Sequence, residues 1–291
     1  MNHEAKGMLL GLVGVSVFGL TLPVTRFVVA TLDPLFIGLG RAVIAGLCAA
    51  LLLFLMKEAL PNRKQIKQLM LVALGVVIAF PLLSSWAMQS VPAAHGGVVI
   101  GVLPLVTVVL STLLSSERPS LGFWLSAVVG SMLVVIYAGL QGMSGFYWGD
   151  LALLAAVVSA AIGYVVGGKL SQQLGGWRVI CWALVLSLPF TLIPASLLLP
   201  HEPLRISLTV WAGFLYLALF SQLFGFFFWY KGLVIGGIAR VSQVQLLQPF
   251  ITLLASVVLL GEVVDQLTIL FAALVVGMVA ISKKTAIRIN Q

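Results

Sequence analysis

Polar residues inside long apolar runs are the groups of this chain most able to do chemistry. Arg41 lies about two turns into the second apolar run, and Thr25 and Arg26 lie in the first. An arginine at the centre of a membrane helix costs at least about 2.5–3.5 kcal/mol, so both arginines are candidates for function. The interpretations stay open: either they contact an anionic group of a bound molecule, or they snorkel or form an ion pair with Asp33 in the loop between the runs.

His95 opens another apolar run, in the stretch VPAAHGGVVIG. Histidine can change its charge near physiological pH; the alternative is a histidine at a helix end that bonds a backbone carbonyl. The 8 acidic residues all lie at the ends of apolar runs or between them. Proton-coupled pumps usually carry Asp, Glu or His inside the membrane. We therefore expect facilitated diffusion or exchange rather than antiport driven by a carboxylate.

Neutral amides and aromatic rings supply the other candidates for contact with a solute. Gln245 and Gln248 lie in one span, and amides this dense are not expected to face lipid. Trp86 and Gln89 are three residues apart and share a helix face, although an interfacial aromatic belt is the alternative for Trp86. The buried phenol of Tyr164 needs a partner. The candidate substrate-contacting residues are Thr25, Arg41, Ser85, Trp86, Gln89, His95, Tyr164, Gln222, Gln245 and Gln248.

Motifs for hydrolysis, metal binding and nucleotide binding are absent from the sequence. It contains no H-E-x-x-H, no G-x-S-x-G and no G-x-x-x-x-G-K-S/T pattern, and Cys48 and Cys181 lie in separate apolar runs. We therefore expect no catalytic residue, no metal and no cofactor. An intramembrane enzyme stays an alternative, but it would need Asp, Glu, His or Ser clustered at one depth.

The composition indicates that lipid surrounds the elements carrying these residues. The 291 residues are 61% apolar and 8% charged, with a mean hydropathy of +1.18, whereas an ordinary soluble domain has roughly 25% charged residues. Apolar runs of about 20 residues are typical of membrane helices. The sequence predicts an all-α integral membrane protein with ten such runs: 7–30, 34–56, 67–89, 92–114, 121–140, 148–169, 177–199, 208–231, 237–260 and 264–282.

The basic residues predict the orientation in the membrane. The gap after the second run holds Lys57, Arg63, Lys64 and Lys67. Lysine and arginine favour the cytoplasmic side, so both termini are expected there. The formal charge of +8 is thereby explained by topology, and no nucleic-acid partner is expected.

A repeat divides the chain into two halves. A shift of 145 residues places Pro104 on Pro249, Thr107 on Thr252, Ser111 on Ser256 and Glu117 on Glu262. Five spans per half is an odd number, so the second half enters the membrane from the opposite side. The sequence thus predicts inverted five-helix repeats at 7–140 and 148–282, as in secondary transporters. Pro104 and Pro249 are expected as hinges beside a cavity, with packing kinks as the alternative.

The paired segments PLVTVVLSTLLSSERPSLGFWLSAVVGSMLVV and PFITLLASVVLLGEVVDQLTILFAALVVGMVA resemble the signature of the drug/metabolite transporter superfamily, EamA type. The opening SVFGLTLPVTRFVVATLDPLFIGLGRAVIAGL, with Arg41 early in its second span, is similar to the first two spans of that family. The resemblance implies ten helices in two inverted halves around a central cavity, lined by spans 1, 3, 4, 6, 8 and 9, and mostly metabolite export. Gln248 departs from the family pattern, in which a glutamate often precedes the proline.

These observations together predict a secondary carrier in a bacterial inner membrane. The expected solute is a small metabolite, with amino acids, aromatic or otherwise apolar, as the leading class; similar bacterial exporters imply this class. Drugs, nucleosides, nucleotide-sugars and polyamines are the alternatives, and a channel is the alternative mechanism. We expect a monomer, with a dimer as the alternative.

Overall fold

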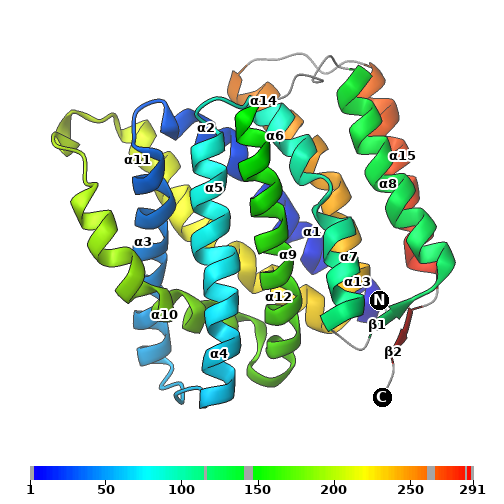
Figure 1. The fold of residues 1–291 in the computed structure, drawn as a ribbon, viewed down its shortest axis with the longest axis horizontal. Helices are drawn as coiled ribbons and strands as arrows, with labels where there is room; N and C mark the ends of the chain where they lie inside the picture. The colour runs from blue at the N-terminus through cyan, green and yellow to red at the C-terminus, as the bar shows by residue number, and fades with distance from the viewer. Residues whose placement is uncertain (1–2, 115–116, 141–146, 261–265, 286, 290–291) are drawn as a thin grey trace.

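The computed structural model describes residues 3–114, 117–140, 147–260, 266–285 and 287–289. Almost all of this chain is helical, and the long helices run alongside one another (Figure 1). Its elements before the midpoint are α1 (His3–Gly19), α2 (Thr21–Val29), α3 (Pro34–Leu55), α4 (Arg63–Val72), η1 (Ala73–Ala79), α5 (Phe80–Ala87), α6 (Ala93–Ile100), α7 (Leu103–Leu114), β1 (Glu117–Pro119) and α8 (Leu121–Leu140).

The remaining elements are α9 (Trp148–Leu174), α10 (Gly176–Leu197), η2 (Pro203–Arg205), α11 (Leu208–Leu215), η3 (Tyr216–Phe224), α12 (Gly225–Gly236), α13 (Ile238–Ser242), η4 (Gln243–Leu247), α14 (Gln248–Leu260), α15 (Gln266–Lys284) and β2 (Ile287–Ile289). The stretches η1 and η3 are π-helical, whereas η2 and η4 are 3₁₀-helical.

Helices of membrane-spanning length confirm that this is a multi-pass membrane protein. By length and composition, 7 helical stretches within the described residues can cross a membrane: His3–Val29, Pro34–Leu55, Arg63–Ala87, His95–Leu114, Trp148–Leu174, Gly176–Leu197 and Leu208–Gly236. Shorter apolar helices lie at Leu121–Tyr137 and Ile269–Ser282. The ten predicted spans and their inverted arrangement stay a prediction.

Local capping sets where several helices begin. The Asp33 carboxylate accepts hydrogen bonds from the backbone N–H groups of Leu35 and Phe36, at 2.8 and 3.0 Å, and so caps α3. Gly175 and Gly237 adopt φ values of +89° and +85°, which residues with a Cβ rarely adopt. These glycines allow α9 to be followed at once by α10, and α12 by α13.

Glycines also allow helices α1 and α12 to approach closely. A Cβ on Gly7 of α1 would lie 2.5 Å from the backbone nitrogen of Gly236 in α12, and one on Gly232 would lie 2.8 Å from the carbonyl oxygen of Gly7. Small residues at such positions allow two membrane helices to pack backbone to backbone. This contact joins the beginning of the chain to its second half.

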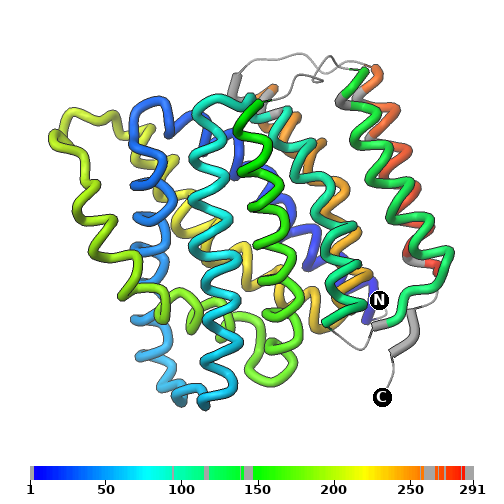
Figure 2. Tube along the Cα trace, viewed as in Figure 1, coloured from blue at the N-terminus to red at the C-terminus, as the bar shows by residue number. Residues whose placement is uncertain are grey.

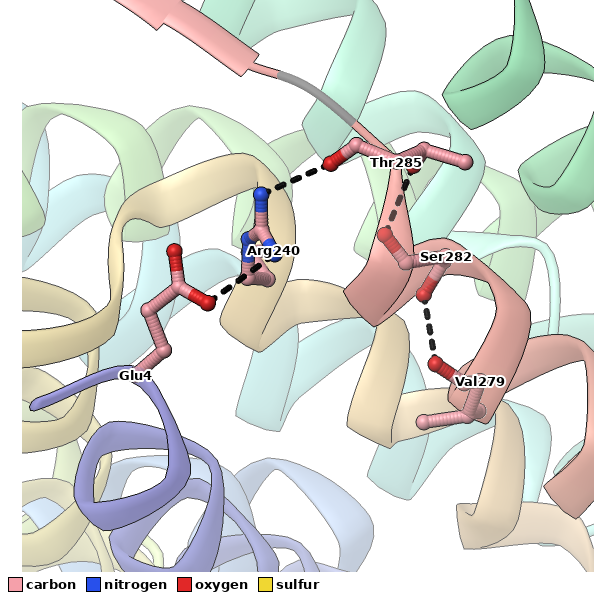
Figure 3. A network of polar contacts seen from close by, with 5 residues as sticks. All are labelled: Glu4, Arg240, Val279, Ser282 and Thr285. Atoms are coloured by element: carbon pink, nitrogen blue, oxygen red, sulfur yellow. Dashed lines mark hydrogen bonds and ion pairs between the residues drawn. The ribbon is translucent and has the colours of Figure 1, made fainter. Parts of the chain in front are cut away.

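The two ends of the described chain meet at one end of the molecule, at the lower right of Figure 2, where α8 and α15 pack together. Strands β1 and β2 pair in antiparallel register, with Arg118 opposite Arg288. Close by, Arg240 of α13 donates to the Glu4 carboxylate at 3.1 Å and to the carbonyl oxygen of Thr285 at 2.8 Å (Figure 3). Contacts of this network therefore fasten α13 to the start of α1 and to the end of α15.

Candidate functional site

A narrow cavity lies at the centre of the helices. About 20 Å³ of its interior is open to a water molecule, which is room for roughly one water, so the cavity is too small for a larger solute in this conformation. Elements from both halves of the chain contribute to its lining: Phe18, Thr21, Leu22, Arg41, Val76, Phe80, Ile100, Leu103, Ala160, Tyr164, Ser221, Gln222, Phe226 and Gln248. Four of the predicted site residues, Arg41, Tyr164, Gln222 and Gln248, are thus brought together.

Arg41 is the charged residue of this lining, and its side chain is only 1% exposed. Its Nη2 donates to the Ser221 hydroxyl at 3.0 Å. Its Nε and Nη1 have no hydrogen-bond partner within the described residues. The Ser221 hydroxyl in turn bonds the Thr21 hydroxyl at 2.8 Å. A buried guanidinium with unused donors is a group that can bind an anion.

Asp33 does not neutralise either arginine, so the predicted ion pair is wrong. Its carboxylate is engaged in capping α3, as described above. Arg26 instead donates to the backbone carbonyls of Met88 and Gln89 at the end of α5. None of the ion pairs found within the described chain includes Arg41.

Amide groups lie beside Arg41 in the cavity. Gln222 is fully buried and donates from Nε2 to the carbonyl oxygen of Val76 at 3.1 Å, while its Oε1 has no partner among the described residues. Both residues belong to π-helical stretches, η3 and η1, a form that is frequent at functional sites. The residues that line the cavity therefore carry both an unused amide oxygen, a hydrogen-bond acceptor, and the unused donors of Arg41.

An aromatic cluster closes one side of the cavity. The Tyr164 ring lies 5.1 Å from Trp229 and 6.1 Å from Phe226, measured between ring centroids, and Phe18 lies 5.0 Å from Phe226. The hydroxyl of Tyr164 lies next to the side chain of Gln245. Aromatic rings packed at a tilt, as these are, offer a surface for an apolar or aromatic solute group.

Two predicted residues lie away from the cavity. The Trp86 side chain is 47% exposed, and Gln89 is exposed beyond the end of α5. Ser84 and Ser85 are buried instead, so α5 turns its serines toward neighbouring helices and its tryptophan outward. This position fits the aromatic-belt interpretation of Trp86.

Thr25 and Ser85 are buried but do not belong to the cavity lining. The Thr25 hydroxyl donates to the backbone carbonyl of Thr21, one turn earlier, at 2.7 Å. The Ser85 hydroxyl has no partner within the described chain. Their involvement with a solute stays a prediction.

His95 bonds a carboxylate rather than a backbone carbonyl, so that part of the prediction is wrong. Its Nε2 lies 3.0 Å from Asp150 Oδ1, and its ring stands edge-on to Tyr147 at 5.0 Å. The other Asp150 oxygen accepts from the Tyr147 backbone N–H at 2.9 Å and so caps α9. The pair joins α6 to α9, outside the lining of the central cavity.

Both predicted hinge prolines begin a helix after an interruption. Pro104 lies in the first turn of α7, after the break at Gly101 and Val102, and Pro249 lies in the first turn of α14, after the 3₁₀ stretch η4. A Cβ on Gly101 would lie 3.1 Å from Pro249 Cγ. The two interruptions are therefore in direct contact, beside the cavity-lining residues Leu103 and Gln248. Their role as hinges stays a prediction.

The sequence analysis missed the hydroxyl pair Thr21 and Ser221 and the rings of Phe18, Phe80 and Phe226. Phenylalanines are too frequent in this chain, 16 in all, for any one to stand out. Ser221 precedes the candidate Gln222 directly, and that adjacency was the usable signal.

Comparison with known proteins identifies a family and several transporters. The sequence pattern of the EamA-like transporter family matches residues 5–138 and 147–282 of this chain. The chain is 43% identical over 286 residues to "Uncharacterized transporter YdeK" of Bacillus subtilis (strain 168), which covers 98% of this chain and 100% of that protein. It is 23% identical over 254 residues to "Probable terminal-alkyne amino-acid exporter" of Streptantibioticus cattleyicolor, covering 86% and 84% of the two chains.

Two further similarities concern part of the chain and the fold. The chain is 30% identical over 201 residues to "Probable amino-acid metabolite efflux pump" of Salmonella typhimurium, covering 64% of this chain and 66% of that protein. A solved crystal structure superposes with a TM-score of 0.78 at 18% identity, over 96% of this chain and 98% of the other. At that identity, the likeness shows the fold alone.

Proposed function

Because the chain belongs to the EamA-like transporter family, we propose that it is a secondary transporter for small amino acid-like metabolites with one carboxylate. The observation that carries this proposal is Arg41, a buried guanidinium in the central cavity with two unpartnered nitrogens and no ion-pair partner within the described chain. A solute carboxylate would supply the missing charge and accept from these donors.

The rest of the lining supports an amino acid with an apolar or aromatic side chain. Gln222 Oε1 offers an acceptor for the solute ammonium group, and the rings of Phe18, Phe80, Tyr164 and Phe226 offer an apolar surface. Relatives named as an amino-acid exporter and an amino-acid metabolite efflux pump support the same class.

Other solutes fit this lining less well. Polyamines are cations, and Arg41 would repel them because no carboxylate belongs to the lining found in the described chain. Nucleotide-sugars carry several negative charges and call for several cations, whereas Arg41 is the cation of that lining. Nucleosides and neutral drugs would leave the guanidinium unpaired. An intramembrane enzyme is a weaker alternative, since the central lining gathers no acid or base pair.

The proposed architecture is ten spans in two inverted halves, 7–140 and 148–282. The family description matches the chain twice, in segments of similar extent. In support, the π-helical stretches η1 and η3 fall at equivalent places under the 145-residue shift, as do the break before α7 and the 3₁₀ stretch η4. Such halves exchange roles in alternating access, and the narrow cavity corresponds to an occluded step.

The proposed setting is the inner membrane of a bacterium, with both termini cytoplasmic, net export or exchange, and a monomer as the working unit. Lys57, Arg63, Lys64 and Lys67 support this orientation. The network of Glu4 and Arg240 would then close the cytoplasmic end.

Counter-flow into proteoliposomes tests the proposal. Vesicles are loaded with one unlabelled amino acid, polyamine or nucleoside at a time. A trace of the same compound in labelled form is then added outside, and its uptake is followed. We expect saturable exchange of apolar or aromatic amino acids, strongly reduced in Arg41→Ala and unchanged in Arg63→Ala, which alters an exposed residue at the start of α4. Saturable exchange of none of the amino acids would overturn the proposal.

A further inference from the structure

Two buried amides, Gln243 and Gln245, form a polar group next to the central cavity but outside its lining. Their side chains are 0% and 1% exposed. None of the four amide atoms makes a hydrogen bond of normal geometry within the described residues, although the Tyr164 hydroxyl lies beside Gln245. Buried side-chain amides are nearly always hydrogen-bonded, and a single unpartnered group calls for an explanation. Here two such groups lie two residues apart in one 3₁₀ stretch, η4, and we name them the η4 amide pair.

The backbone of η4 is itself unusual. It connects α13 to α14 inside an otherwise continuous helix and is packed by α1, α7, α8 and α15. A 3₁₀ stretch within a helix often marks a functional hinge. Irregular backbone at membrane depth is tolerated where it is buried in protein or lines a wet cavity. The η4 amide pair therefore lies between α13 and α14, in a stretch whose backbone is 3₁₀-helical rather than α-helical.

Tyr164 connects the η4 amide pair to the cavity. Its ring belongs to the cavity lining, while its hydroxyl lies next to Gln245. The neighbouring Trp229 is fully buried, and its Nε1 also has no partner within the described chain. Polar atoms without a normal hydrogen bond thus occur both in the cavity lining, at Gln222, and beside Tyr164, at Gln245. A packed apolar core alone would not retain them, because replacing unpartnered polar groups by apolar ones is stabilising.

We propose that the η4 amide pair is a second binding station on the solute pathway, separated from Arg41 by the ring of Tyr164. The inference rests on the proposed function and extends it by naming where the polar end of the solute binds after leaving the guanidinium. Amides offer donors and acceptors without net charge, so they suit a zwitterion and hold it less tightly than Arg41. A strong site followed by a weaker one favours release.

Cysteine accessibility tests whether the η4 amide pair lies on a water-filled path. Gln245→Cys is made in a chain carrying Cys48→Ala and Cys181→Ala, and the charged reagent sulfonatoethyl methanethiosulfonate is applied to each side of proteoliposomes. The control is Leu246→Cys, because Leu246 is equally buried and packs against Gly130. We expect Gln245→Cys to react on the order of tenfold faster than the control, from one side, and L-phenylalanine to slow the reaction. Equal, slow labelling of both cysteines would overturn the proposal.

The variant Gln245→Leu provides an independent readout. We expect its counter-flow of L-phenylalanine to fall on the order of tenfold while its midpoint of thermal unfolding stays equal or rises, since a buried unpartnered amide is removed. Gln172→Leu, at an exposed position of α9, is the control. Wild-type transport in Gln245→Leu would overturn the proposal. If wild type exchanges no amino acid but Gln245→Cys labels selectively, the station stands and only the amino-acid assignment fails.

Discussion

The Arg41 guanidinium on α3 donates to the Ser221 hydroxyl on η3 at 3.0 Å, 180 residues away in sequence. This bond ties an element of the first half to one of the second at the central cavity. It uses one of three guanidinium nitrogens, and the other two have no partner within the described residues. Those two nitrogens can still donate to an acceptor group, which we assign to a solute.

Replacing Arg41 separates its charge from its shape. Arg41→Gln is expected to weaken apparent solute affinity by about 10–100-fold, since hydrogen bonds to charged groups are worth about 1.5–3 kcal/mol. Arg41→Lys keeps the charge but loses the planar fork, so an intermediate loss is expected. Counter-flow measured over a range of solute concentrations checks both. Equal affinity in Arg41→Gln and wild type would contradict the assignment.

Gly7 is expected to tolerate no side chain. The Cβ in Gly7→Ala would lie 2.5 Å from the Gly236 backbone, so α1 and α12 must separate, at a cost of about 1–3 kcal/mol. Gly277→Ala is the matched control, because nothing lies within 4 Å of its added Cβ. Thermal unfolding in detergent compares them. A Gly7→Ala protein as stable as Gly277→Ala would show that this helix contact is not close in solution.

The network in Figure 3 predicts unequal effects of its two charged members. The Arg240 side chain is 9% exposed and that of Glu4 is 46% exposed. Glu4→Gln should cost at most about 1 kcal/mol, because solvent screens the carboxylate, and Arg240 keeps its bond to Thr285. Arg240→Gln removes both bonds and should be clearly more destabilising. Thermal unfolding of both single variants and of the double variant measures these losses of stability. Equal losses in the two single variants would contradict this account.

Transport is expected to proceed without a pH gradient. The central lining within the described chain contains no carboxylate and no histidine, and the His95–Asp150 pair caps α9 outside it. Adding an uncoupler to counter-flow should therefore leave the rate unchanged, in wild type and in His95→Gln. Collapse of wild-type transport on uncoupling, together with its loss in His95→Gln, would instead make this pair a proton site.

The long helices and the importance of Arg41 were predictable from sequence. Both depend on properties of a single stretch of chain: its hydrophobicity, and the free-energy cost of placing a charge within it. The apolar runs gave the long helices within a few residues, and the cost of a buried guanidinium singled out Arg41. Partners were not predictable. The Asp33 carboxylate could accept from the backbone N–H groups at the start of α3 or from an arginine. It accepts from the backbone N–H groups, which are nearer in sequence. His95 had two kinds of acceptor, and only the packing of α6 against α9 selects Asp150.

The direction in which side chains point within the bundle could not be predicted from the sequence either. Trp86 and Gln89 share a helix face, but which neighbour that face meets depends on the rotation of α5 in the bundle. The π-helical stretches η1 and η3 shift that rotation, and no residue pattern announces them. Gln222 and Gln248 belong to the cavity lining and their contact with a solute stays a prediction, whereas Ser221 and Thr21 were not singled out.

The central claim, that Arg41 holds a solute carboxylate, is tested most directly by competition between an amino acid and its amide. L-Phenylalanine and L-phenylalaninamide differ only in the group that would face Arg41. Each is added as a competitor to counter-flow of the amino acid that wild type exchanges fastest. We predict that wild type prefers the acid by about tenfold or more, and that Arg41→Gln loses this preference. The same preference in both proteins, or none in wild type, would contradict the account.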